Sequence, residues 1–91
     1  KLVIRNIRKE RKRVFDKINS FNELKAFKSD ANFVLFEAGK KYQSLYRKLI
    51  KKGIVIRNIG DIDKHKGCLR VTIGTPKMNN KFLNELKVVY K

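Results

Sequence analysis

The spacing of apolar residues changes along this chain, and that change limits the folds that are open to it. In "YQSLYRKLI" (42–50), apolar side chains recur at the i, i+3, i+4, i+7 and i+8 positions of one helical face. In "CLRVTI" (68–73) they recur at every second residue, which is the period of a strand with one buried face. A chain in which these two periods alternate is expected to pack helices against a sheet.

The same pattern along the whole chain predicts helix, weak strand, strand, helix, strand, strand and helix in that order. These elements fall at residues 2–18, 24–28, 31–36, 42–50, 54–59, 68–73 and 76–90. Apart from Asn32, the run 31–36 is apolar, and it is expected to form a well-buried strand, whereas the polar residues 60–67 are expected to form a loop. We therefore predict an α+β fold, a two-layer sandwich in which helices cover one face of a small, mostly antiparallel sheet.

Local signals support the helix ends. Lys51 and Lys52 place cations in the last turn of the second helix, and Gly53 then tolerates the positive φ of a helix end. Thr75 is a suitable hydroxyl cap for the last helix, followed by a proline at its first position. In the first helix the cluster "RKERKR" (8–13) is expected mostly to face water.

Charge and cysteine content restrict the function classes. Lys and Arg number 24 against 8 acids, giving a net charge of +16 that attracts phosphates, acidic proteins or anionic lipid. The single cysteine, Cys68, cannot form an internal disulfide, and no Cys/His cluster predicts a metal site. No apolar run approaches the roughly 20 residues of a membrane span, so neither a metal nor a membrane is expected as a partner. The composition suits the reducing cytoplasm.

Strand alternation places two arginines on one face of the sheet. The apolar residues of 68–73 share a face that packs under the helices, so Arg70 points the other way, and the same holds for Arg57 in "IVIR" (54–57). A hairpin can bring the two guanidinium groups together, and at ~5 Å like charges repel by about 3 kcal/mol. Either an anion lies beside them, bound bidentately, or both are solvated and screened by salt. The alternation leaves both interpretations open.

Three blocks resemble a known family in their order along the chain. "SDANFVLF" (29–36), "KKGIVIRNI" (51–59) and "GCLRVTIGT" (67–75) resemble the C-terminal small domain of histidinol-phosphate aminotransferase, a fold-type I enzyme that depends on pyridoxal phosphate. The resemblance covers most of the chain and is weak in the first helix. It implies that residues 1–91 are the small domain of such an aminotransferase and lack its large cofactor-binding domain.

The resemblance implies substrate-binding roles for both arginines. The family's arginine in the "LRVTIGT" strand, here Arg70, binds the α-carboxylate of the substrate. The arginine after the "GI-V-" strand, here Arg57, is expected to contact the acidic end of the substrate, phosphate included. Arg70 would then face the large domain and the substrate. Asn32 matches a family position near this region, where a structural hydrogen bond is expected.

The resemblance also implies the cofactor and the partners. Pyridoxal 5'-phosphate and the residues that hold it belong to the large domain, so no catalytic, cofactor-binding or metal-binding residue is expected in this chain. The complete enzyme is expected to be a homodimer of histidine biosynthesis that exchanges an amino group between L-histidinol phosphate and 2-oxoglutarate. Its substrate is a phosphorylated amino acid or amino alcohol, and these 91 residues alone are expected to be inactive.

A small basic nucleic-acid-binding α+β domain is the alternative. Basic patches at residues 8–13, 47–52 and 64–66 favour it. The stacking aromatics that an RNA-binding sheet needs are missing near Cys68 and Arg70, and no GxxG loop is present. Phe33 and Phe36 lie in the strand expected to be buried, and His65 is expected to be exposed in the polar loop without partners. Nucleic acid is therefore the less expected partner.

Overall fold

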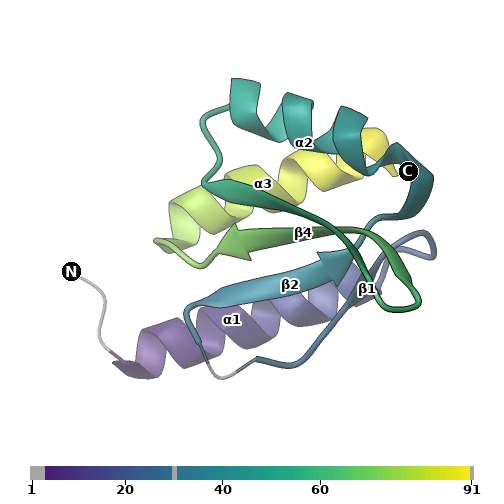
Figure 1. Ribbon diagram of the computed structural model, residues 1–91. Coiled ribbons are helices and arrows are strands. Elements are labelled where there is room, and N and C mark those ends of the chain that lie inside the picture. The colour runs from purple at the N-terminus through teal and green to yellow at the C-terminus, as the bar shows by residue number, and fades with distance from the viewer. Residues whose placement is uncertain (1–3, 30, 91) are drawn as a thin grey trace.

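Three helices pack on a four-stranded antiparallel sheet in the computed structural model, which describes residues 4–29 and 31–90 (Figure 1). The helices are α1 (Ile4–Asn19), α2 (Tyr42–Lys51) and α3 (Pro76–Val89), and a single 3-10 turn, η1 (Gly39–Lys41), leads into α2. The strands are β1 (Lys25–Ala26), β2 (Phe33–Glu37), β3 (Ile56–Ile62) and β4 (His65–Thr72). This architecture confirms the predicted α+β fold. Leu2, the expected start of the first helix, and Asp30 lie outside the described residues.

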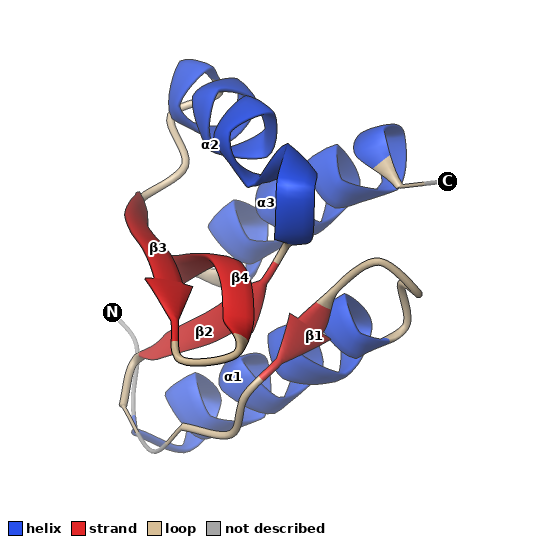
Figure 2. Ribbon diagram, turned by 45° about the vertical axis from the view of Figure 1, so that its right-hand side comes forward, coloured by secondary structure: helices blue, strands red, loops and turns tan. Residues whose placement is uncertain are grey.

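The strand order in the sheet is β1-β2-β4-β3, and every neighbouring pair is antiparallel. Helix α1 packs against β1 and β2, whereas α2 packs against β3 and β4. Helix α3 contacts both other helices, so the three helices form one layer and the sheet forms the other (Figure 2). After α2 the chain forms β3 at the edge of the sheet opposite β1. Strand β4 then lies between β3 and β2.

The core lies between the two layers and follows the predicted apolar pattern closely. Phe36 of β2 and Phe82 of α3 meet near its centre, with ring centroids 5.9 Å apart. Further fully buried side chains come from all three helices and from the two central strands: Val14, Ile18, Val34, Leu45, Leu49, Leu69 and Leu86. Ile50, predicted on the apolar face of α2, is instead 46% exposed, because it lies about 100° around the helix from the buried Leu49.

The predicted loop at residues 60–67 is wrong, because the two last strands pair almost to their turn. Strand β3 continues to Ile62 and β4 begins at His65, so only Asp63 and Lys64 connect them. Asp63 adopts a φ of 51°, which aspartate tolerates better than most residues. The ladder has register shifts on either side of Gly60, whose φ is 87°. The polar residues 60–67 therefore extend the β3–β4 hairpin beyond the core, and they do not form a loop.

Strand β2 is buried on one face only. Val34 and Phe36 are buried, whereas Phe33, Leu35 and Glu37 are half-buried on the other face. The prediction of a well-buried strand therefore holds for the helix-facing side chains, while those on the other face are only half-buried. Its apolar residues alternate between the face that the helices cover and a face that no described element covers. Both faces of the strand therefore carry apolar side chains.

A buried carboxylate joins α1 to the start of α3. Glu10, expected to face water with its basic neighbours, is only 7% exposed. Its Oε1 accepts hydrogen bonds from Asn79 Nδ2 at 2.9 Å and from Arg13 NH2 at 2.7 Å. The guanidinium of Arg13 is the main reason that the pKa of Glu10 lies below its usual value. Burial is tolerated because both partners satisfy the charge. Helical periodicity could not reveal Asn79, because it lies on another helix, 69 positions along the chain.

Candidate functional site

Arg57 and Arg70 are direct partners on neighbouring strands. Their Cα atoms are paired in the ladder between β3 and β4, and both side chains lie on the face of the sheet that the helices leave open. Their chain neighbours Ile56 and Val71 point into the core and are 8% and 2% exposed. Arg57 is exposed and Arg70 is half-buried. The predicted placement of the two arginines on one face is confirmed, and their substrate-binding roles stay predictions.

The described residues supply no acid to this pair. The ion pairs of residues 4–29 and 31–90 involve Lys12, Arg13, Lys52, His65 and Lys66, and none reaches Arg57 or Arg70. Like charges at directly opposed positions of a ladder are destabilising, although solvent screens much of the repulsion of an exposed group such as Arg57. Such a pair is suited to an anion, because each guanidinium can bind a carboxylate or phosphate through two N–H groups.

Phe33 contributes to this site, and the sequence reasoning missed it. The Cζ of Arg70 lies over the Phe33 ring, 4.6 Å from its centroid. The alternation that placed Arg70 on the open face could have found this residue, because Phe33 faces away from the buried Val34 next to it. With Arg70 over its ring, Phe33 does not offer a free platform on which a nucleic-acid base could stack.

Asn32 takes part in the structure through its main chain. Its carbonyl accepts a hydrogen bond from Ile73 N at 2.9 Å, which continues the pairing of β2 with the end of β4. Any residue would supply this backbone bond, so a structural role for the Asn32 side chain stays a prediction. The side chain of Asn32 is exposed.

His65 has partners, contrary to the prediction that it is exposed and alone. Its Nδ1 lies 3.1 Å from Glu37 Oε1, and its ring packs edge-on against Phe27 with centroids 4.7 Å apart. The close β3–β4 hairpin brings the start of β4 against the end of β2, which explains the difference. The pKa of Glu37 is lowered chiefly by the hydrogen bond from Lys66 N, at 2.9 Å, and further by His65.

Cys68 is fully buried, although it lies two residues before Arg70 and strand alternation alone would put both on the open face. It pairs with Glu37 on β2 and with Gly60 on β3, so the main chains of both neighbouring strands flank it. Burial raises the pKa of its thiol. A buried thiol with a raised pKa is a poor nucleophile, and Cys68 is not a candidate for covalent chemistry.

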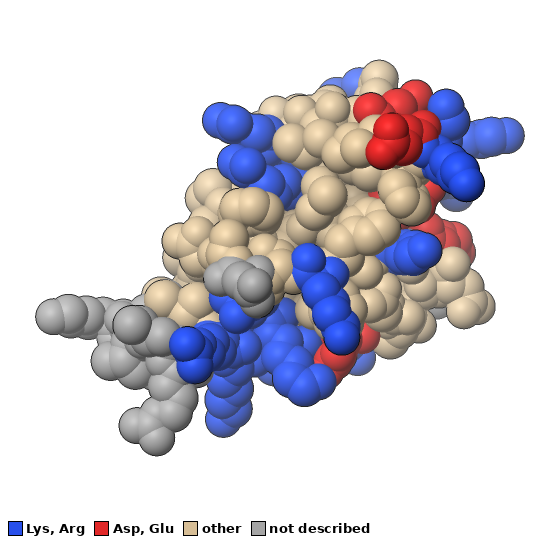
Figure 3. Space-filling view, turned by 60° about the horizontal axis from the view of Figure 1, so that its bottom comes forward, with Lys and Arg blue, Asp and Glu red and all other residues tan. Residues whose placement is uncertain are grey.

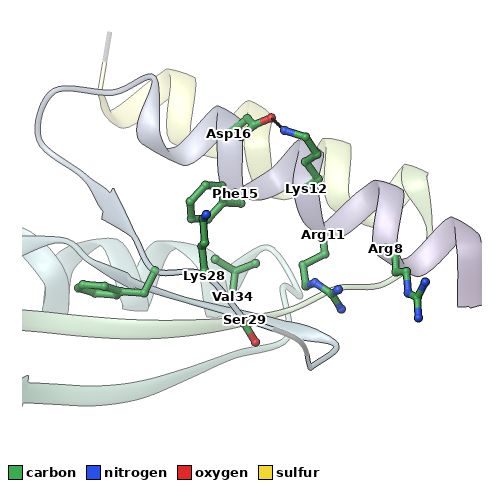
Figure 4. A pocket seen from close by; sticks show the side chains of 9 residues that line it. Arg8, Arg11, Lys12, Phe15, Asp16, Lys28, Ser29 and Val34 are labelled. Atoms are coloured by element: carbon green, nitrogen blue, oxygen red, sulfur yellow. Dashed lines mark hydrogen bonds and ion pairs between the residues drawn. The ribbon is translucent and has the colours of Figure 1, made fainter.

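A basic hollow lies on the other side of the sheet (Figure 4). It has a volume of about 320 Å³ between α1 and residues 27–29, and Val34, a core-facing residue, lies in its wall. Figure 3 shows Lys and Arg side chains gathered on this side of the molecule. Two of its cations are engaged within the chain, since Arg11 donates to Ala31 O at 2.9 Å and Lys12 pairs with Asp16 at 2.8 Å. Neither Arg57 nor Arg70 lines the hollow. Because two of its cations already have partners, the hollow is less suited to binding a small anion than the arginine pair is.

No lysine of the described residues is buried in the way that a cofactor-bound lysine would be. A lysine that forms an imine with this cofactor needs desolvation or a neighbouring cation to lower its pKa. Lys17 is half-buried, and every other lysine within residues 4–29 and 31–90 is exposed. Within the same residues no group of three or more His, Cys, Asp or Glu could hold a metal ion. None of the described helices has the length and apolar character needed to cross a membrane.

Known proteins resemble this chain over most of its length. The family model for aminotransferase class I and II matches residues 4–86. The histidinol-phosphate aminotransferase of Aquifex aeolicus is 36% identical over 84 residues, which are 92% of this chain and 24% of that protein. The chain thus spans about a quarter of the length of the curated relatives that it matches.

Solved structures share the fold over nearly the whole chain. The histidinol-phosphate aminotransferase of Clostridium acetobutylicum has a TM-score of 0.75 and 37% identity, covering 91% of this chain and 26% of that one. The L-threonine-O-3-phosphate decarboxylase of Porphyromonas gingivalis has a TM-score of 0.80 at 18% identity, over 97% of this chain and 28% of its own, and shows the fold alone. From the family match and these relatives, this chain belongs to the aminotransferase class I and II family.

Proposed function

We propose that this chain is the substrate-orienting C-terminal small domain of a pyridoxal-phosphate-dependent aminotransferase that acts on L-histidinol phosphate and 2-oxoglutarate. The observation that carries the proposal is the direct pairing of Arg57 with Arg70 on the open sheet face, without an acid from the described residues. The similarity to histidinol-phosphate aminotransferases supports the choice of L-histidinol phosphate.

The two arginines divide the substrate's anionic groups between them. Arg70 binds the α-carboxylate of 2-oxoglutarate and of the glutamate formed from it. Arg57 binds the distal anion, which is the second carboxylate of 2-oxoglutarate or the phosphate of histidinol phosphate. Histidinol phosphate is an amino alcohol and has no carboxylate, so the carboxylate contact of Arg70 serves the amino acceptor. Fixing the substrate in this way raises the rate by orientation.

In this proposal the cofactor site lies in a part of the protein outside this chain. A large domain outside this chain covers the open sheet face and holds the cofactor, because the described lysines do not fit that role. The complete protein works as a homodimer, and the 91 residues by themselves have no aminotransferase activity. This chain's part is to bind and orient the anionic ends of the substrate.

The test is Arg70→Lys in the complete protein, with Arg47→Lys as a matched control on the exposed surface of α2. Lysine keeps the charge and loses the two-pronged geometry. We expect kcat/KM for 2-oxoglutarate to fall about 100-fold in the first variant, with the cofactor absorbance unchanged, and to stay as in the parent in the second. Unchanged turnover of every amino acceptor in Arg70→Lys would contradict the carboxylate role.

A further inference from the structure

We infer that Phe33 is a positioning residue that holds the guanidinium of Arg70 in the orientation that binds a carboxylate. This inference rests on the proposed function of Arg70. It assigns a role in anion recognition to an aromatic residue of β2, the strand on the other side of β4 from Arg57. The residue acts through Arg70 and need not touch the substrate.

The register of the sheet brings the two side chains together. Leu35 is the direct partner of Arg70 across β2 and β4, and Phe33 is the direct partner of Thr72. Phe33 is therefore the diagonal neighbour of Arg70 on the same face, within reach of a long side chain. Arg70 Cζ lies 4.6 Å from the centre of the Phe33 ring, inside the usual range of a cation–π contact. Both residues are half-buried.

The position of Arg57 explains why Arg70 needs such a support. Arg57 is the direct partner of Arg70 on the opposite side, in β3, so without a ligand its positive charge pushes Arg70 away. An arginine side chain has many rotamers through which it could turn into solvent. The Phe33 ring attracts the guanidinium on the side away from Arg57. A guanidinium lying over a ring keeps the N–H groups at its rim available for a carboxylate.

Phe33 has no comparable role in the core. The half-buried aromatic residues that pack against the core cluster are Phe15, Phe21, Tyr42 and Tyr46. Phe33 is not one of them, and it faces away from the helices. Its ring is therefore placed where it contacts Arg70 and contributes little to helix–sheet packing. The described contacts point to preorganisation of the site, which improves affinity by reducing what must be ordered on binding.

The experiment compares Phe33→Leu and Phe33→Met with Phe33→Tyr in the complete protein. Phe27→Leu is the matched control, because Phe27 also lies under a cation, Lys25, at 5.8 Å, and its ring packs against His65. The probe is glutarate, a dicarboxylate without a reacting keto or amino group. Its dissociation constant is measured by calorimetry, and kcat/KM is measured separately for 2-oxoglutarate and for L-histidinol phosphate.

We expect Phe33→Leu and Phe33→Met to weaken glutarate binding about tenfold, and to lower kcat/KM for 2-oxoglutarate more than for histidinol phosphate. Phe33→Tyr keeps the ring and is expected to bind like the parent, as is Phe27→Leu. In an Arg70→Lys background the change at Phe33 should have little further effect, because the two residues act as one unit.

The outcomes separate the two levels of the account. If Arg70→Lys weakens glutarate binding and neither Phe33 variant does, the positioning role is wrong and the proposed function stands. If the Phe33 variants weaken 2-oxoglutarate and histidinol phosphate equally, the ring has a general structural role and the inference is again overturned. If Arg70→Lys leaves glutarate binding unchanged, the proposed function itself fails. If one of Phe33→Leu and Phe33→Met does not fold, the other is used. If neither folds, Phe33 has a structural role and the inference is refuted.

Discussion

Glu10 on α1 and Asn79 on α3 share a hydrogen bond of 2.9 Å, although 69 positions separate them in the chain. The Asn79 amide also binds both backbone groups of Gly74, with its Oδ1 accepting from Gly74 N at 2.9 Å and its Nδ2 donating to Gly74 O at 3.1 Å. One buried side chain thus fixes the loop that leaves β4 shortly after Arg70. This contact ties the helical layer to the strand that carries the proposed site.

Replacing Asn79 by alanine is expected to destabilise the fold. The change leaves the buried carboxylate of Glu10 with one partner fewer and frees the backbone of Gly74, so we expect a loss of about 2–4 kcal/mol in the free energy of unfolding. Chemical denaturation measures it. Asn80→Ala, at the exposed next position of the same helix, is the control and should stay within about 0.5 kcal/mol of the parent. Equal effects of both changes would contradict a stabilising role for the hydrogen bonds of Asn79.

Stability is expected to fall in acid through two carboxylates. The pKa of Glu10 is lowered chiefly by Arg13, and that of Glu37 chiefly by the Lys66 N–H group. A carboxyl whose folded pKa lies below its unfolded value stabilises the fold above the unfolded pKa, here near 4.5, and this contribution disappears as the pH falls through the folded pKa.

Unfolding curves between pH 6 and about pH 3 test this dependence. Glu10→Gln should lower the stability at pH 6 and flatten its decline toward acid, because the group that takes up a proton is gone. Glu23→Gln, on an exposed residue, is the control. A Glu10→Gln protein that loses stability in acid as steeply as the parent would contradict the assignment.

Gly67 is expected to tolerate no side chain. Its φ is 68°, and a Cβ there would lie 2.6 Å from Tyr42 Cδ1 and closer still to the carbonyl oxygen of Gly39. Gly67→Ala combines an unfavourable φ with a backbone clash, and we expect it to cost more than about 2 kcal/mol. Gly60→Ala is the matched control, because its φ is 87° but nothing lies within 4 Å. The thermal midpoints of both variants measure the difference, and similar values would contradict a role for close packing.

The faces of the central strands could be predicted because strand alternation depends only on neighbouring residues. Arg57 and Arg70 were placed on one face in this way, and the predicted helix boundaries benefited from Gly53 and Thr75. Thr75 caps α3 by accepting a hydrogen bond from Met78 N at 3.2 Å. These signals are local, and they were sufficient for the order of elements and for the sides of the sheet.

Contacts between distant parts of the chain could not be predicted in the same way. Glu10 looked like one more charge in a solvated cluster, because its partner Asn79 belongs to another helix. The run containing Phe33 is apolar on both faces, so the pattern did not show which face remains open. His65 was expected in a loop, because a polar hairpin and a polar loop have the same composition until a turn residue such as Asp63 is recognised.

The central claim is that Arg70 holds the carboxylate of the substrate on the open face of the sheet. A crystal structure of the complete protein with glutarate tests it most directly. We predict that two guanidinium nitrogens of Arg70 lie about 2.7–2.9 Å from the oxygens of one carboxylate, with Phe33 behind the guanidinium and Arg57 at the other carboxylate. Glutarate bound elsewhere, with Arg70 paired to an acid of the large domain, would contradict the account.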